Sequence, residues 1–254
     1  MERLTRKGRI VFGLAIAALG VVNFCCAHFR LAMSGVPWAP VNSFLCYLTG
    51  AALVAAGLCI AANFKSRLVA TLLGYLFLAF VLLRALPQVV AYPADWSVYG
   101  ILCEALSLGA AAWILAQTQP GDASAFETAL GKVTAAGPYF FAAALIVFGS
   151  IHFLVARFIA SLIPAWIPGS LFWTYFTGTA LIASGVSIAI RQLYRQAGFL
   201  LGIMFLLWFV LLHIPRVAAN IHNPDEWSSA FIALAMVGAS WIVASSDWHG
   251  RIVR

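Results

Sequence analysis

The residues with the clearest chemical potential stand where a hydrophobic run ends. Residues 209–227 read FVLLHIPRVAANIHNPDEW, in which His213 and Arg216 are three apart and the carboxylate of Glu226 follows. Residues three apart share a face of a helix. An imidazole beside a guanidinium can hydrogen-bond a carbonyl group or hold an anion, and an imidazole beside a carboxylate can exchange a proton. This segment is therefore the first candidate for a ligand-binding site.

Further ionisable residues lie inside other hydrophobic segments. An ionisable side chain within a bilayer costs about 2.5–3.5 kcal/mol on insertion scales, so several at one depth indicate mutual pairing or a hydrated pocket. The sequence leaves two interpretations open: the residues form a pocket on the non-cytoplasmic side, or they pair and snorkel to fix the ends of helices. The candidate ligand-binding residues are His152, Arg157, His213, Arg216, Glu226 and Glu104.

The composition identifies the surroundings of these residues. The chain has 254 residues, of which 63% are hydrophobic and 9% charged. Soluble domains carry about 25% charged residues, so this surface is expected to face a lipid bilayer. The net charge of +7 does not indicate a nucleic-acid partner, because the basic residues stand at the ends of hydrophobic segments.

Hydrophobic segments of the right length recur along the whole chain. A spanning helix needs about 20 mostly apolar residues. The sequence therefore predicts an all-α polytopic membrane protein with eight transmembrane helices, at approximately residues 10–29, 41–63, 68–90, 97–116, 139–162, 171–190, 197–219 and 228–244.

The two halves of the sequence repeat one another. LGVVNF at 19–24 matches FGSIHF at 148–153. At an offset of 128, Gly50, Gly57, Arg67, Gly74 and Pro87 recur as Gly178, Gly185, Arg195, Gly202 and Pro215. We expect an internal duplication: a four-helix unit at 1–118, a polar linker at 119–136 and a second four-helix unit at 137–254. An even number of helices per unit makes the two repeats parallel.

The distribution of basic residues predicts the orientation. Loops on the cytoplasmic side carry an excess of lysine and arginine. Eleven basic residues fall on one side and four on the other, which places both termini in the cytoplasm. The larger set is Arg3, Arg6, Lys7, Arg9, Lys65, Arg67, Lys132, Arg191, Arg195, Arg251 and Arg254, and the smaller is Arg30, Arg84, Arg157 and Arg216.

Motifs for metals, haem and common enzymes are lacking in the sequence. The five cysteines form no CxxC pair, and no HExxH, GxSxG, Walker or GxGxxG pattern occurs. His152 and His213 could be axial haem ligands only if their rings faced each other, and hydrogen-bonded core histidines are the favoured interpretation. Cys25 or Cys26, together with Cys46 and Cys103, could form a thiol-exchange site in the first unit alone. The six glycines of the repeat are expected to serve close helix packing.

Three stretches of the second unit resemble the DoxX-type membrane proteins. They are IHFLVARFIASLIPAWIPG, FWTYFTGTALIASGVSIAIRQLYRQAG and LLHIPR, and the resemblance covers residues 137–244 and, more loosely, 8–116. The first unit keeps the pattern in VPWAP and YLTGAALVAAG but lacks the histidine and arginine of HIPR. The resemblance implies a membrane subunit near quinone-linked or thiol redox chemistry, with its site in the second unit.

These observations predict an accessory or scaffold subunit of a membrane redox system in a prokaryotic cytoplasmic (inner) membrane. The sequence does not identify a cofactor: the pocket could take a quinone-like or another lipophilic ligand, or contact a partner protein. The expected partners are the lipid bilayer, a redox protein and further copies of the chain. A small-solute carrier or channel is the alternative, although the polar residues near the middle of the membrane are mainly Thr49, Thr177, Ser184 and Ser187. A membrane enzyme would need Glu104 or Glu226 to exchange a proton with His213.

Overall fold

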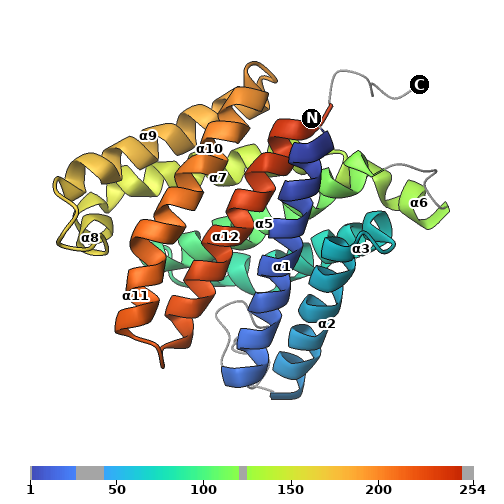
Figure 1. Cartoon of the computed structure of the whole chain (residues 1–254), viewed down its shortest axis with the longest axis horizontal. Helices are drawn as coiled ribbons and strands as arrows, with labels where there is room; N and C mark the ends of the chain where they lie inside the picture. The colour runs from blue at the N-terminus through green and yellow to red at the C-terminus, as the bar shows by residue number, and fades with distance from the viewer. Residues whose placement is uncertain (1, 27–42, 120–124, 248–254) are drawn as a thin grey trace.

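The computed structural model describes residues 2–26, 43–119 and 125–247 (Figure 1). Within these ranges the chain is helical, and eight of its helical stretches are long and apolar enough to cross a membrane. The elements are α1 (Glu2–Cys26), α2 (Ser43–Ala62), α3 (Ser66–Phe80), η1 (Val81–Ala85), α4 (Leu86–Ala91), α5 (Trp96–Thr118), α6 (Ala125–Thr134), α7 (Gly137–Leu154), α8 (Ala156–Ser161), α9 (Ser170–Ala189), α10 (Tyr194–Trp208), η2 (Phe209–His213), α11 (Ile214–Ala219) and α12 (Pro224–Ser245).

The predicted number of spanning helices is confirmed, and two details differ from the prediction. The expected helix at 139–162 is two helices, because Val155 leaves the helical conformation with φ −121° and ψ 38°. The hydrophobicity of the sequence continues through this turn, so it gives no sign of the break. The polar linker contains α6, which is rich in helix-forming residues. The hydroxyl of Tyr75 on α3 donates to the carbonyl of Leu130 and fastens α6 to the bundle.

The first helix of each half packs against the last helix of the other half. Figure 1 shows α1 lying between α2 and α12. In the same way α7 packs against α9 and α5, while α3 packs on α5 and α10 on α12. The helices α5 and α12 also contact each other and form the centre of the bundle. The two halves are therefore interleaved through α1 and α7.

Glycines allow the closest of these helix contacts. A Cβ atom on Gly57 would lie 2.4 Å from the carbonyl oxygen of Gly13, and one on Gly238 would lie 2.4 Å from the backbone nitrogen of Phe12. Both distances are to backbone atoms, so no side-chain rearrangement can make room. Small residues allow helix backbones to approach in this way in membrane proteins, and the expected packing role of the repeated glycines is confirmed at Gly57.

Two local features recur 128 residues apart. The indole of Trp113 occupies the space of a Cβ on Gly74, and Trp241 does the same at Gly202. The short π-helices η1 and η2 occupy equivalent positions, each just before a helix with proline in its first turn. A proline has no N–H to donate, and the backbone shifts to bonds between residues five apart, as between the Ile214 N–H and the Phe209 carbonyl.

Candidate functional site

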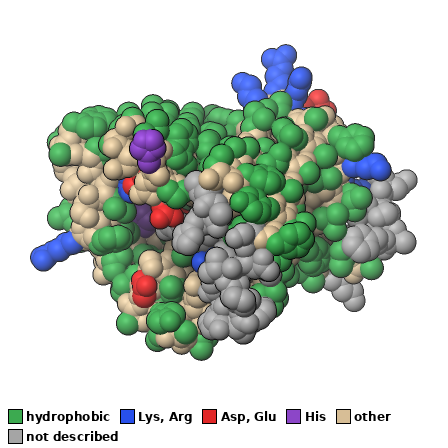
Figure 2. All heavy atoms as spheres, turned by 90° about the horizontal axis from the view of Figure 1, so that it is seen from below, with side chains coloured by type: hydrophobic (Ala, Val, Ile, Leu, Met, Phe, Trp, Pro, Cys, Tyr) green, Lys and Arg blue, Asp and Glu red, His purple; other side chains and the backbone are tan. Residues whose placement is uncertain are grey.

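A cavity of about 650 Å³ lies at the end of the bundle where α7 and α10 end and where α5, α9 and α12 begin. This end is opposite the described ends of the chain, because Gly8 near the start of α1 packs against Ile242 near the end of α12. Figure 2 shows the molecule from this side, where acidic and histidine side chains gather in one half of a largely hydrophobic face. The cavity lies between the halves, since α5 belongs to the first and the other helices to the second.

Most of the cavity lining is apolar, and aromatic rings form much of it. The aromatic side chains are Trp96, Phe148, Phe158, Trp173, Phe205 and Trp208. Cavities for small organic ligands are typically 300–1,000 Å³ and mostly apolar, with a few polar groups that orient the ligand. The volume and the lining of this cavity match that description.

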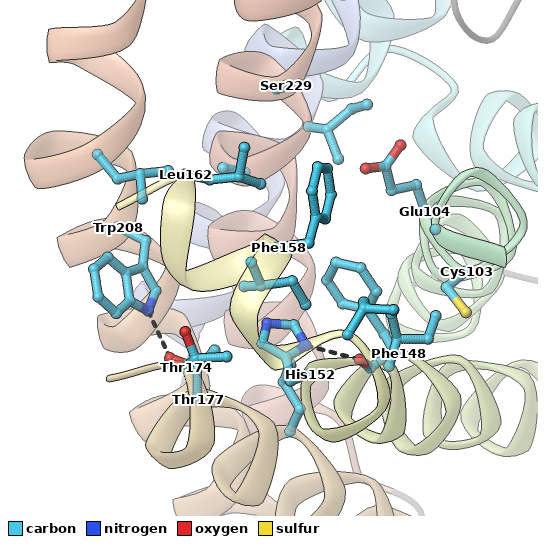
Figure 3. A pocket seen from close by; sticks show the side chains of 18 of the residues that line it. Cys103, Glu104, Phe148, His152, Phe158, Leu162, Thr174, Thr177, Trp208 and Ser229 are labelled. Atoms are coloured by element: carbon cyan, nitrogen blue, oxygen red, sulfur yellow. Dashed lines mark hydrogen bonds between the residues drawn. The ribbon is translucent and has the colours of Figure 1, made fainter. Parts of the chain in front are cut away.

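His152 is held in one orientation by the last turn of α7. Its Nδ1 lies 2.8 Å from the carbonyl oxygen of Phe148, and the two rings meet edge to face (Figure 3). A carbonyl oxygen can only accept, so in the neutral imidazole the proton is on Nδ1 and Nε2 is an acceptor. The side chain is buried, and its Cβ lies against Gly178 on α9, which has no side chain to displace it.

His213 stands at the last position of the π-helix η2 and lines the same cavity. Its Nδ1 is buried and has no hydrogen-bond partner among the residues that the structure describes. A buried polar atom of this kind is rare in native structures and often marks a position where a ligand or a water binds. The wider turn of the π-helix sets the direction of the imidazole. Short π-helical segments of this kind are frequent at functional sites.

The guanidinium of Arg216 forms a two-point ion pair with Glu226. The Nε–Oε2 distance is 2.9 Å and the Nη2–Oε1 distance is 2.8 Å. Arg216 lines the cavity from α11, whereas Glu226 lies behind it in the first turn of α12. The pair therefore joins the two helices and holds the guanidinium at the edge of the cavity.

Two carboxylates reach the cavity from α5 and the turn before it. Glu104 lines the cavity from α5 (Figure 3). Asp95 caps the N-terminus of α5 by accepting a hydrogen bond of 2.9 Å from the backbone N–H of Ser97. Hydrogen bonds from the hydroxyl and the N–H of Ser97 hold the pKa of the Asp95 carboxyl below its usual value.

The structure brings together four of the six residues that the sequence proposed. His152, His213, Arg216 and Glu104 line the cavity. Glu226 reaches the site only through its ion pair with Arg216, and Arg157 is exposed on α8 and does not line the cavity. Of the residues in the smaller basic set, Arg30 lies outside the described residues, as do Arg251 and Arg254 of the larger set.

Several lining residues carried no signal that sequence reasoning could use. Thr177 accepts a hydrogen bond of 3.2 Å from the indole N–H of Trp208 across the cavity floor (Figure 3). In the sequence, Thr177 is one of several polar residues expected near the middle of the membrane, and Trp208 lies in an unbroken hydrophobic segment. Neither context indicates a cavity. Cys103 also lines the cavity, and both it and Cys46 are buried free thiols.

The first half has a different residue at the position of His152. Asn23 packs against Gly50 much as His152 packs against Gly178. The Asn23 side chain is fully buried, and neither amide atom has a hydrogen-bond partner among the described residues. The side chains that reach the cavity nevertheless come from the second half and from α5.

Comparison with known proteins gives one match. The family model described as Domain of unknown function (DUF8561) matches residues 141–246, a range that includes His152, His213 and Arg216 but not Glu104. No curated protein and no solved structure matches the chain. Within the described residues, no group of three or more His, Cys, Asp or Glu side chains could hold a metal ion.

Proposed function

We propose that this protein is a DoxX-like subunit of a membrane redox system that binds a lipophilic ligand of the quinone class in the cavity. The observation that carries the proposal is the convergence of His152, His213, Arg216 and Glu104 on one largely apolar cavity that contains six phenylalanine and tryptophan rings. An aromatic lining suits a planar ring, and the polar groups suit the ring's oxygen substituents.

The proposal includes an arrangement in the membrane. The matching π-helices and glycine–tryptophan contacts support a tandem duplication into two parallel four-helix units, at 1–118 and 137–254. The basic residues at the starts of α1, α3 and α10 support cytoplasmic termini and a cavity that opens on the other side. The proposed location is the inner membrane of a prokaryote. The proposed partners are a redox protein and further copies of the chain.

Direct binding tests the ligand class. Titration of decylubiquinone into the purified protein in lipid nanodiscs should quench tryptophan fluorescence, because Trp96, Trp173 and Trp208 line the cavity. A phenylalanine at Gly100 should weaken binding at least about tenfold, or about 1.4 kcal/mol, because a Cβ there meets no atom within 4 Å and the ring enters the cavity.

Gly131 offers a matched control for this blocking variant. It is also a helical glycine whose Cβ would meet nothing within 4 Å, but it lies on α6 and does not line the cavity. Gly131→Phe should bind decylubiquinone as the wild type does. Equal binding by Gly100→Phe and the wild type, with both variants folded, would refute the proposed site.

A further inference from the structure

Four hydrogen-bond donors on the cavity lining are engaged within the protein. The indole N–H of Trp208 is donated to Thr177, and that of Trp173 to the carbonyl of Pro168 at 3.1 Å. The hydroxyls of Thr174 and Ser107 are donated to backbone carbonyls one helical turn earlier, at 2.9 Å and 2.6 Å. A ligand that needs to accept hydrogen bonds therefore finds none of these four donors available.

Arg216 follows the same pattern. Its Nε and Nη2 both donate to Glu226. Two parallel hydrogen bonds between a guanidinium and a carboxylate are strong and fix the geometry of both groups. The edge of the guanidinium that carries these two nitrogens is therefore occupied by the protein's own carboxylate, and a ligand can reach only the edge at Nη1.

His152 presents an acceptor instead of a donor. Its Nδ1 proton is used by the Phe148 carbonyl, and Figure 3 shows the second ring nitrogen on the side of Trp208 and Thr174. The opposite tautomer would set two acceptors 2.8 Å apart at Phe148, so the proton stays on Nδ1.

We infer that the cavity selects a ligand whose ring carries a hydroxyl group, such as a phenol or a hydroquinone, and that His152 determines this selectivity. The ligand hydroxyl donates to Nε2 of His152, and the ring lies among Phe148, Phe158 and Trp208. A carbonyl or ether oxygen at the same place would bring two lone pairs together and leave Nε2 without a partner, so a quinone such as decylubiquinone is expected to bind more weakly than its hydroquinone. This inference rests on the proposed function, because it assigns the chemical class of the ligand in the same cavity.

A matched pair of probes tests the hydroxyl directly. Para-nonylphenol and its methyl ether share the ring and the tail and differ only in the ability to donate. Their affinities would be measured in nanodiscs at about pH 8.5, two units above the ordinary imidazole pKa, so that the ring is neutral. We expect the wild type to bind the phenol about tenfold more tightly than the ether.

Substitution at His152 identifies the acceptor. His152→Phe removes Nε2 and keeps an aromatic ring, so both probes should bind this variant within about twofold of each other. Should His152→Phe fail to fold, nitrogen NMR of the wild-type imidazole supplies the test: the Nε2 resonance should shift on addition of the phenol and not of the ether. Equal wild-type affinities for both probes, or a preference that persists in His152→Phe, would overturn the inference.

The Gly100→Phe variant distinguishes a failure of the inference about His152 from a failure of the proposed function. If both probes bind the wild type, both are weakened by Gly100→Phe, and no preference for the phenol exists, the inference about His152 fails and the proposed cavity stands. If neither probe binds, or if Gly100→Phe has no effect on either, the proposed ligand-binding function fails together with the inference.

Discussion

Replacing Gly238 by valine is expected to lower the free energy of unfolding by about 3 kcal/mol, the upper part of the usual range for overpacking. A Cβ at this position would lie 2.4 Å from the nitrogen of Phe12, 2.7 Å from the carbonyl oxygen of Gly8 and 2.8 Å from the Cα of Phe12. All three atoms belong to the backbone of α1, so α1 and α12 must separate. Detergent-induced unfolding followed by circular dichroism measures the loss.

Gly131→Val is the matched control for this substitution. Its Cβ meets no atom within 4 Å, and α6 takes no part in the contact between α1 and α12. It should therefore change the free energy of unfolding by no more than about 0.5 kcal/mol, as exposed substitutions usually do. If Gly238→Val were as stable as Gly131→Val, the interleaving of the two halves through α1 and α12 would be wrong.

Removing one partner of the Arg216–Glu226 ion pair should be similarly costly. Breaking a buried pair costs about 3–5 kcal/mol because the remaining charge is left uncompensated. We expect about 3 kcal/mol for Glu226→Leu, the lower end of that range, because the Arg216 side chain is 26% exposed and retains some contact with solvent. Glu226 is 12% exposed, and its carboxylate makes both hydrogen bonds to the guanidinium.

A double-mutant cycle distinguishes the ion pair from the two individual side chains. Arg216→Met combined with Glu226→Leu removes both charges and keeps the apolar volume, so the double variant should be within about 1 kcal/mol of the wild type. Losses from the two single variants that simply add up in the double variant would show that the two charges do not interact.

The spanning helices were predictable because bilayer thickness imposes a length on them. Unbroken hydrophobic segments bounded by charges and prolines are enough to locate eight such helices. The turn at Val155 was not predictable, since the adjoining residues Phe153, Leu154 and Ala156 are all apolar and include no glycine or proline. Pro87 and Pro215 each lack the N–H that an α-helix needs, and a short π-helix precedes each of them.

The interleaving of the halves lies beyond the reach of sequence reasoning. The glycines predict that helices approach closely, but they do not say which helix lies opposite. Gly238 packs against Phe12 in the other half of the chain, while Gly185 packs against Ala142 in its own half. Partner choice depends on the fit of two whole helix surfaces, and a periodic pattern of small residues on one helix does not contain that information.

The polar residues of the site could be predicted from the sequence, whereas its apolar residues could not. His152, His213 and Glu104 stood out because an ionisable group inside a hydrophobic segment is costly and needs a reason. Arg157 satisfied the same criterion, but α8 carries it to the surface instead. Phe158 and Trp208 had no such mark, because aromatic residues are equally suited to facing lipid, a neighbouring helix or a ligand.

Identification of the small molecule that co-purifies with the protein is the most direct test of the cavity as a ligand-binding site. Mass spectrometry of the organic extract should compare wild-type protein with Gly100→Phe and Gly131→Phe, all purified from the same membranes. We predict one lipophilic compound with a hydroxyl-bearing or quinone ring, near one molecule per chain, in the wild type and Gly131→Phe and depleted in Gly100→Phe. Identical extracts from all three proteins, containing only bulk phospholipid, would contradict the account.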